Sequence, residues 1–410
     1  MPHQTAAELY ESTRSHACAA ALSAGVGTLA DELQERLTSV QRWSLFPPRP
    51  EIRWPRNVLV APSCPTSLHS SSAWSLSDFR LLRRVGGGRN STVYQAVHCP
   101  SNTTIALKVY AKCTLSAVTR RQVQREIEIQ GRLDHEHIAK LHGAFEDEQN
   151  LVLILEFAVR GDLLRHISRS GPLTGAWIVN SVLRPTLSAL DHLHQQGIVF
   201  RDLKPENLLL ACGTVKLADF GTAIDLHQER PLSRLGTLDY MAPEVLRCTD
   251  RECPDLAYGP AADIWALGAM LHELLLGKTP FSHSDALVTM KGIMEDEVHI
   301  EGSCASDAAQ DFILQCLRKD AHQRPSVQEL LQHPWLQAAE VEQGESCSLP
   351  QQQCSDRSAP IMPAADGIRD IIFRSRRRRA SKPQASPQRQ LGRPSRTLLD
   401  APQRDHTSVV

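Results

Sequence analysis

The sequence predicts an α+β protein with two lobes, a small β-rich lobe followed by a larger helical lobe. Short runs rich in β-branched residues lie at residues 79–85, 92–98 and 104–110, with Gly or Asn breaks between them. Beyond Gly161 the apolar spacing becomes mostly helical. The composition changes at both ends of this periodic region, which indicates disordered tails on either side of one folded domain.

Two elements complete the predicted small lobe. Residues 118–132 read as a helix, because apolar Val123, Ile127 and Ile129 recur among charged residues. Residues 151–157 form an almost continuous apolar run, which is typical of a buried strand. In the larger lobe, helices are expected at residues 177–195, 262–276, 307–317 and 327–331.

Composition sets the domain limits. Residues 1–76 end in a Pro/Ser-rich stretch and are expected to be a mostly disordered extension. The folded domain is expected at residues 77–336, with lobes at 77–157 and 158–336. Residues 337–410 contain Gln, Ser/Pro pairs and a basic run at 374–379, and read as a disordered tail.

Bulk properties exclude several classes of function. The net charge is −1, so no global field favours nucleic acid or an anionic membrane. The 11 cysteines are scattered without a C-x-x-C pair, which is typical of reduced thiols in an intracellular protein. No apolar run approaches the ~18 residues that a membrane helix needs. We therefore expect a protein of the cytoplasm or nucleus, with no membrane or nucleic-acid partner.

A glycine triplet lies between the first two predicted strands. Gly86, Gly87 and Gly88 would let backbone N–H groups approach phosphates without interference from side chains. A glycine-rich hairpin turn without a ligand explains this motif equally well.

A lysine at the end of a predicted strand, which taken singly reads as a surface lysine, and a helical glutamate follow the triplet. Lys108 ends the predicted strand segment 105–108, and Glu126 lies in the next helix at a distance suited to pairing with it. Glu128 is the alternative partner. The helical phase that directs Ile127 and Leu133 inward favours Glu126.

Two motifs twelve residues apart carry the main chemical signal. In residues 201–207, Asp202 would accept or orient a substrate hydroxyl proton, Lys204 would contact a γ-phosphate and Asn207 would hold a metal ion. Asp219, in the sequence Asp-Phe-Gly, offers a second metal carboxylate. The two motifs at this separation point to phosphoryl transfer from ATP with Mg²⁺.

Later residues complete the pattern. Residues 236–244 are typical of the end of an activation segment, and Arg324 is expected to pair with Glu244. Asp263 is expected to hold the backbone of the catalytic loop. These parts exclude small-molecule kinases, which lack such a segment.

From these motifs, residues 78–336 resemble the protein kinase superfamily, and several stretches are similar to the Aurora group. They are Trp74 before the domain, residues 125–130 in the helix, residues 151–158 and residues 236–240. The helix segment includes Gln130 at a position that is usually apolar. The resemblance implies a bilobal protein kinase fold, with ATP and Mg²⁺ as cofactors and protein Ser/Thr hydroxyls as substrates.

The resemblance also assigns the adenine site. Leu155 would be the gatekeeper, and the backbones of Glu156 and Ala158 would face adenine. The nucleotide contacts expected in total are Gly86, Gly87, Gly88, Val93, Ala106, Lys108, Glu156, Ala158 and Leu209.

Four positions depart from the Aurora pattern. Ser91 replaces the third glycine and Asn90 replaces the aromatic tip of the loop, so the phosphate cover is expected to be looser. Phe200 stands where the catalytic loop usually has histidine, and Thr222 stands where Aurora kinases have tryptophan. These departures leave a mitotic role open.

Two other function classes compete with an active kinase. A pseudokinase scaffold would not need the six ionic positions, which are all chemically intact: Lys108, Glu126, Asp202, Lys204, Asn207 and Asp219. The basic run at 374–379 could instead serve as a nuclear localisation signal or bind an acidic surface, although a solvated linker explains it better.

Regulation is expected in the activation segment. Ser233 lies four residues before Thr237, where the Aurora-like phosphosite falls, and Arg201 could pair with a phosphate there. An unphosphorylated surface serine is the alternative. The resemblance also leaves room for an activating protein partner.

Two carboxylates predict the substrate preference. Glu206 in the catalytic loop and Asp162 beyond the hinge match positions that bind arginine in basophilic kinases. Arginines also lie three residues before Ser233 and Ser381, which makes both candidate autophosphorylation sites. The alternative to substrate binding is that Glu206 merely pairs with a neighbouring arginine of the same chain.

Overall fold

A computed structural model describes residues 59–68, 74–88, 90–170, 173–211, 213–248, 258–300 and 305–341. All of them belong to one compact unit within residues 1–364. The basic run at 374–379, Ser381 and residues 1–58 lie outside the described residues.

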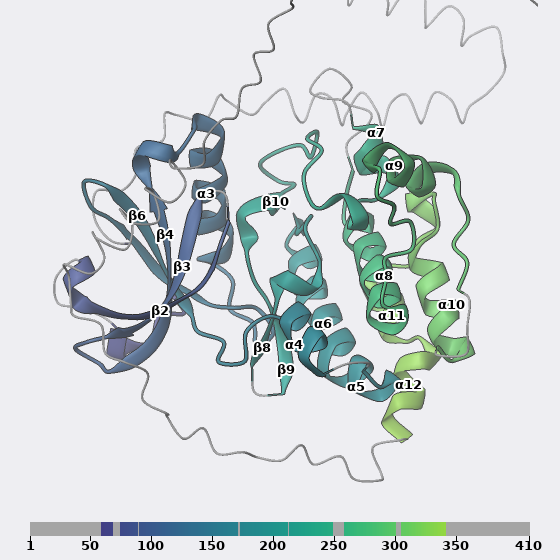
Figure 1. Cartoon of the computed structure of the whole chain (residues 1–410), viewed down its shortest axis with the longest axis horizontal. Helices are drawn as coiled ribbons and strands as arrows, with labels where there is room; N and C mark the ends of the chain where they lie inside the picture. Colours follow the sequence, from purple (N-terminus) through teal and green to yellow (C-terminus); the bar gives the residue numbers. More distant parts are fainter. Residues whose placement is uncertain are drawn as a thin grey trace, which may run out of the picture. The chain divides into compact units, whose positions relative to one another are not determined.

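The smaller lobe is built on a six-stranded antiparallel sheet with the order β1-β5-β6-β4-β3-β2 (Figure 1). In register, Lys108 faces Val93 on one neighbouring strand and Leu153 on the other. Central strands β4 and β6 are almost entirely buried, which agrees with their continuous apolar sequence. The strands are β1 (Leu59–Val60), β2 (Phe79–Gly87), β3 (Ser91–His98), β4 (Thr103–Ala111), β5 (Leu141–Glu146) and β6 (Asn150–Glu156).

Helix α3 (Ala117–Gln130) packs on this sheet and carries Glu126. The Ser116 hydroxyl caps its first turn by accepting a hydrogen bond from the Thr119 N–H at 3.1 Å. Val123 and Ile129 are buried on the inner face, as the periodicity predicts. The cap and this apolar face fix the rotation of α3, and hence the direction of Glu126.

Part of the N-terminal extension contributes to the fold of the smaller lobe. Strand β1 pairs with β5, and the Ala61 N–H donates to the His142 carbonyl at 3.0 Å. Trp74 is buried and its Nε1 donates to the Leu68 carbonyl at 2.9 Å. Strand β1 has only two residues and lies in a Pro-rich stretch, so it shows no alternation of apolar and polar residues. The sequence composition therefore gave no sign of this strand.

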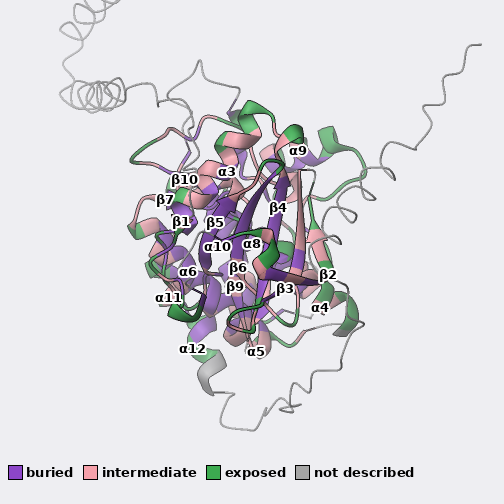
Figure 2. Ribbon diagram, turned by 90° about the vertical axis from the view of Figure 1, so that its left-hand side faces the viewer, coloured by how far each residue is buried: buried purple, intermediate pink, exposed green. Residues whose placement is uncertain are grey.

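The larger lobe, which lies mostly behind the sheet lobe in the view of Figure 2, is helical and has its core around α8. Twelve of the sixteen residues of α8 are buried, including Trp265 and Asp263. The predicted helix at 177–195 runs through α5, a π-helical stretch (Ile178–Leu183) and α6. The other helices are α4 (Leu163–Ser170), α7 (Pro243–Arg247), α9 (Ala286–Glu295), α10 (Asp307–Cys316), α11 (Val327–Leu331) and α12 (Pro334–Val341), with α5 at Gly175–Trp177, α6 at Arg184–Gln195 and α8 at Ala261–Leu276.

Two small antiparallel pairs bring the catalytic motifs to the boundary between the lobes. Strand β7 (Ile198–Val199) pairs with β10 (Ile224–Asp225), and β8 (Leu208–Ala211) pairs with β9 (Thr214–Leu217). The predicted catalytic loop lies between β7 and β8, and the Asp-Phe-Gly motif lies between β9 and β10. In the part of the chain that the structure describes, no helix has both the length and the apolar character to cross a bilayer.

Candidate active site

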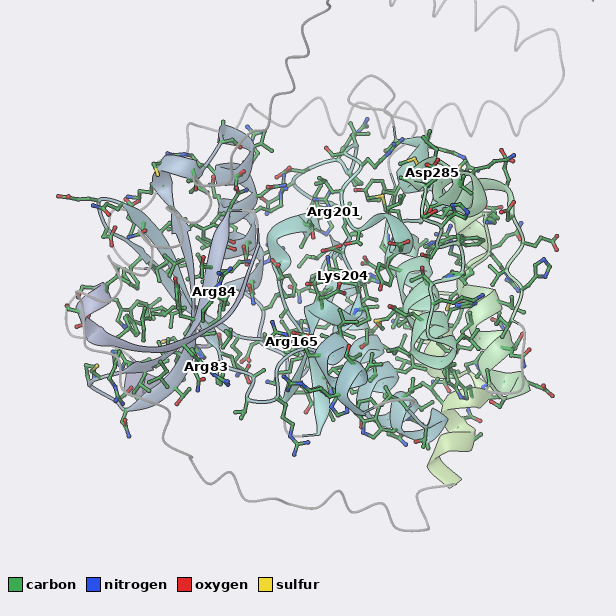
Figure 3. The ribbon with its side chains drawn as sticks, in the orientation of Figure 1. Arg83, Arg84, Arg165, Arg201, Lys204 and Asp285 are labelled. Carbon is green, nitrogen blue, oxygen red and sulfur yellow. The ribbon has the colours of Figure 1, made fainter. Side chains whose placement is uncertain are left out.

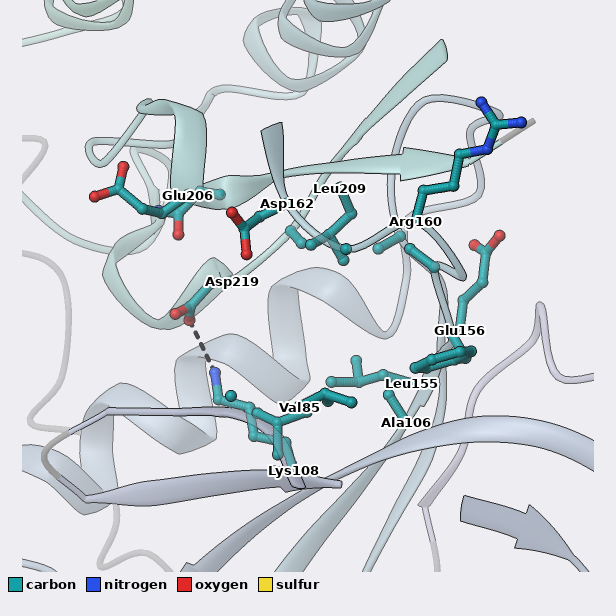
Figure 4. Close-up of a pocket in the computed structure, with 18 of the residues that line it drawn as sticks. Val85, Ala106, Lys108, Leu155, Glu156, Arg160, Asp162, Glu206, Leu209 and Asp219 are labelled. Carbon is teal, nitrogen blue, oxygen red and sulfur yellow. Dashed lines mark hydrogen bonds and ion pairs between the residues drawn. The ribbon is translucent and has the colours of Figure 1, made fainter. Parts of the chain in front are cut away.

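A cavity of about 460 Å³ opens between the two lobes (Figure 4). Glu206 and Asp162 lie on its helical-lobe side, opposite Val85 and Ala106 of the sheet. The predicted nucleotide contacts that line it are Gly86, Val93, Ala106, Lys108, Glu156, Ala158 and Leu209. The predicted metal and substrate residues that line it are Asn207, Asp219, Glu206 and Asp162.

Lys108 lies at the centre of a buried ionic cluster. Its Nζ is 2.7 Å from Glu126 Oε1 and 2.8 Å from Asp219 Oδ1. The Tyr110 hydroxyl donates to the other Glu126 oxygen at 2.8 Å, a contact that the sequence analysis missed. Burial alone would lower the pKa of Lys108, but Asp219 and Glu126 outweigh burial and hold it well above its usual value. Lys108 therefore stays charged in the cavity.

Glu126 contacts this lysine, and Glu128 faces elsewhere. The Glu126 side chain is 1% exposed, whereas Glu128 accepts a hydrogen bond from Gln124 on the exposed surface of α3. One turn further along, Gln130 is buried and donates to the Ala139 carbonyl at 2.7 Å. This hydrogen bond satisfies the NH2 end of the amide, whereas its Oε1 is buried without a partner among the described residues.

Asp219 points into the cavity from a strained backbone. Its φ of 65° lies in the left-handed region, which is uncommon for a residue other than glycine. Phe220 is fully buried behind it, and the Asp219 side chain is 55% exposed toward the cleft. The positive charge of Lys108 holds the pKa of Asp219 below its usual range. This carboxylate is therefore ionised and can bind a cation.

Asn207 offers a second oxygen on the same side of the cavity. Its Nδ2 donates to the Asp202 carbonyl at 2.7 Å and to Asp202 Oδ2 at 3.0 Å. These bonds fix which end of the amide is the donor, so the oxygen end remains for a cation. A carboxylate and an amide oxygen are the hard ligands that Mg²⁺ prefers, and they fit one carried by ATP phosphates.

Asp202 lies in a network with Lys204 and Thr237. Lys204 Nζ is 2.7 Å from Asp202 Oδ2 and 2.7 Å from Thr237 Oγ1. The Thr237 hydroxyl donates to Asp202 Oδ1 at 2.9 Å. A base and a cation from the catalytic loop are thus tied to the end of the activation segment (Lys204 and Arg201 are labelled in Figure 3).

Asp263 of α8 anchors the catalytic loop, as expected. This fully buried carboxylate accepts hydrogen bonds from the backbone N–H groups of Phe200 at 2.9 Å and Arg201 at 2.8 Å. His194 Nε2 lies 2.9 Å from it. Phe200 uses its N–H for this anchor and packs its ring edge-on against Phe220, at 5.2 Å between centroids. The phenylalanine that replaces the usual histidine therefore leaves the Asp263 anchor of the catalytic loop intact.

Only part of the glycine triplet lines the cavity. Gly86 does, whereas Gly87 and Gly88 are not among the lining residues that the structure describes. The Gly88 N–H donates to the Ser91 carbonyl at 3.1 Å and closes the hairpin. The Asn90 amide donates to Thr119 at 3.3 Å, so the loop tip is held against α3. This contact opposes the looser cover expected from Asn90.

Further contacts hold the activation segment in place. Arg324 pairs with Glu244 through two hydrogen bonds at 2.6 and 2.8 Å, as expected. Arg201 donates through Nη1 to the Tyr258 hydroxyl at 3.2 Å, and that hydroxyl donates to the Ser233 carbonyl at 2.9 Å. The Ser233 side chain is exposed, and Nη2 of Arg201 is buried without a partner among the described residues.

The two predicted substrate carboxylates have different surroundings. Asp162 caps α4 and pairs with Arg165 at 3.1 Å, whereas Glu206 is exposed and has no ion pair among the described residues. Glu273 of α8, which the sequence analysis missed, accepts a hydrogen bond from Tyr240 at 2.5 Å. Burial and the nearby negative charge of Glu206 raise the pKa of Glu273. Glu206 and Glu273 therefore form one acidic pair.

Comparisons with known proteins agree with this geometry. A sequence model of the protein kinase domain family matches residues 79–336. An Aurora kinase of Debaryomyces hansenii is 35% identical over 65% of this chain and 64% of its own length. The serine/threonine-protein kinase Aurora-2 of Arabidopsis thaliana is 35% identical over 64% of this chain and 91% of its own. Aurora kinase C of Mus musculus is 33% identical over 68% and 96%.

The length shared differs among these relatives, since the chain spans somewhat less than two thirds of the yeast protein and nearly all of the mouse one. The shared region is the folded domain with its buried Lys108–Glu126 pair and its catalytic loop. The chain belongs to the protein kinase family, as an Aurora-like serine/threonine protein kinase.

Proposed function

We propose that the chain is catalytically active and transfers the γ-phosphate of ATP-Mg to Ser or Thr hydroxyls of proteins. The observation that carries this proposal is the contact of Lys108 with both Glu126 and Asp219 at the cavity. A pseudokinase scaffold has no need to keep Lys108 and Glu126 buried together beside the Asp219 carboxylate of the cleft, because burying unneeded charges destabilises the fold.

Different residues of the site would bind the nucleotide and the metal ion. Adenine would bind between Ala106 and Leu209 against the backbones of Glu156 and Ala158, with Lys108 on the phosphates. Asp219 and Asn207 would hold the Mg²⁺, which neutralises charge on the transferred group.

At the other end of the site, Asp202 would orient the acceptor hydroxyl and take its proton. Lys204, 2.7 Å away, would neutralise charge on the γ-phosphate. Thr237 ties both to the activation segment, so transfer depends on the order of that segment.

We further propose a preference for arginine two or three residues before the acceptor. The carboxylates of Glu206, which is exposed, and Glu273, which is partly buried, are close enough to interact and together favour a guanidinium, which donates paired hydrogen bonds. Asp162 contributes less, because its carboxylate is already paired with Arg165.

A degenerate peptide array is expected to show enrichment of arginine upstream of the acceptor. Glu206→Gln should raise KM for an arginine peptide about tenfold, with little effect on KM for ATP, because one charge-assisted contact is lost. Glu295→Gln, which removes an exposed carboxylate from α9, is the matched control. A profile without upstream arginine, or one that requires proline after the acceptor, contradicts the assignment.

Phosphorylation of Ser233 is proposed to raise activity further. The exposed hydroxyl is accessible to a kinase, and Nη2 of Arg201, which has no partner among the described residues, could donate hydrogen bonds to the phosphate. In a phosphorylated preparation, Ser233→Ala is expected to lower kcat about threefold to tenfold. Ser233→Ala activity equal to that of fully phosphorylated wild type, with the site's occupancy confirmed by mass spectrometry, contradicts this proposal.

We propose the cytoplasm or nucleus as the site of action, because no cysteine among the described residues lies in a disulfide. Protein substrates follow from the family, and an activating protein partner remains part of the proposal.

A further inference from the structure

An arginine of α3 and another just after the helix pair with two carboxylates of the activation segment. Arg125 donates through Nε to Glu229 Oε1 at 3.2 Å and through Nη2 to Glu229 Oε2. Arg132, just after the helix, donates to Asp225 Oδ2 at 2.7 Å. We call these four residues the α3 clamp. They join elements about a hundred residues apart in sequence.

The Arg125–Glu229 pair of the clamp is largely shielded from water, whereas the Arg132 side chain is 41% exposed. The side chains of Arg125 and Glu229 are 12% and 23% exposed, so their attraction is screened less than that of a surface pair. Asp225 also accepts hydrogen bonds from the His227 N–H at 2.9 Å and from Gln228 at 2.8 Å. Burial alone would raise the pKa of Asp225, but these bonds and Arg132 hold it below its usual value.

The position of Arg125 links the clamp to the chemistry. Arg125 immediately precedes Glu126, whose carboxylate lies 2.7 Å from Lys108 Nζ. A rigid helix cannot move Glu126 away from Lys108 without also moving Arg125 away from Glu229. The clamp and the Lys108–Glu126 pair therefore form and break together.

A phosphate on an activation segment can hold such a segment in place by pairing with arginines. Here a carboxylate of the chain itself already pairs with Arg125 through two hydrogen bonds. Burial lowers the pKa of Arg201, and the nearby Glu229 charge is among the groups that oppose this shift, so the same carboxylate also acts on the arginine of the catalytic loop.

We propose that Glu229 is a positioning residue that holds α3 in its active place without phosphorylation, so that the unphosphorylated enzyme has substantial basal activity. The inference rests on the proposed kinase activity. Phosphorylation of Ser233 would then act mainly through Arg201 and add to this basal rate.

The test uses the full-length chain, treated with phosphatase and shown by intact mass to carry no phosphate. Glu229→Gln keeps the shape of the side chain and removes its charge. We expect kcat for a peptide substrate to fall about tenfold, with KM for ATP nearly unchanged, because fewer molecules have α3 in place. Hydrogen exchange within residues 117–130 should become faster.

A charge swap separates this role from a merely structural one. Arg125→Glu alone should resemble Glu229→Gln, and the double variant Arg125→Glu with Glu229→Arg should recover kcat to within about threefold of wild type. Glu295→Gln and, in this dephosphorylated state, Ser233→Ala should match wild type. Thermal unfolding of each variant checks that it is folded.

Three outcomes overturn the inference. They are wild-type kcat in dephosphorylated Glu229→Gln, a folded double variant as slow as the single ones, and a wild-type enzyme active only when phosphorylated. The last outcome leaves the proposed kinase function intact. A chain that binds ATP and transfers no phosphate in either state refutes the proposed function itself, and the inference with it.

Discussion

Asp202→Asn is expected to lower the rate of phosphoryl transfer about 10³-fold, because an amide cannot accept the proton of the acceptor hydroxyl. Nucleotide affinity should stay close to that of wild type. The Asp202 side chain contacts Lys204, Asn207 and Thr237, and none of its hydrogen bonds reaches Lys108 or Asp219. The measurement is transfer from saturating ATP-Mg to a peptide, together with ADP binding by calorimetry.

Asp311→Asn is a suitable control for this variant. Asp311 lies on α10 and its side chain is 62% exposed, so the change should leave both activity and binding unaltered. Near wild-type turnover of Asp202→Asn would show that the proton acceptor is another group.

Asp219→Ala is expected to abolish productive binding of Mg²⁺ and to lower kcat by about 10²- to 10³-fold. The only carboxylate among the predicted metal ligands is lost, and Lys108 keeps Glu126 as its acidic partner. The predicted signature is specific. ADP affinity should rise with Mg²⁺ in wild type and should no longer respond to Mg²⁺ in the variant.

This second prediction is independent of the first. Asp202→Asn should keep the wild-type response of ADP affinity to Mg²⁺, and so should Asp311→Asn. A full Mg²⁺ response in Asp219→Ala would place the metal elsewhere.

The fold was predictable where the periodicity is strong. Strands β2, β3 and β4, helix α3 and helix α8 lie close to their expected ranges, because each has a continuous apolar face. Strand β5 was missed, since Gly143 and His142 interrupt its pattern. A Cβ at Gly143 would lie 2.3 Å from the Trp74 ring, so glycine is required there by a residue far away in sequence. Short-range patterns cannot reveal such a requirement.

The site was predictable where one segment of sequence contains it. The Lys108–Glu126 pair, the Asp202 loop and the Asp219 motif were located from motif spacing, and the structure brings them to one cleft. The contacts that support these residues were not predictable from the sequence. Tyr110, Glu273 and Glu229 act through partners fixed by tertiary packing, and each is an ordinary residue in its own element. The contacts of Arg201 were missed for the same reason. This residue was expected to pair with a phosphate, but its side chain already donates to the Tyr258 hydroxyl and the Thr222 carbonyl.

One assay tests the central claim most directly. The purified chain is incubated with Mg²⁺, ATP labelled on its γ-phosphate and a degenerate library of Ser/Thr peptides, beside Asp202→Asn. We predict label on serine or threonine with wild type, and transfer near background with the variant. If nucleotide binds and wild-type transfer does not exceed that of Asp202→Asn, the chain is a pseudokinase and the account of its active site is wrong.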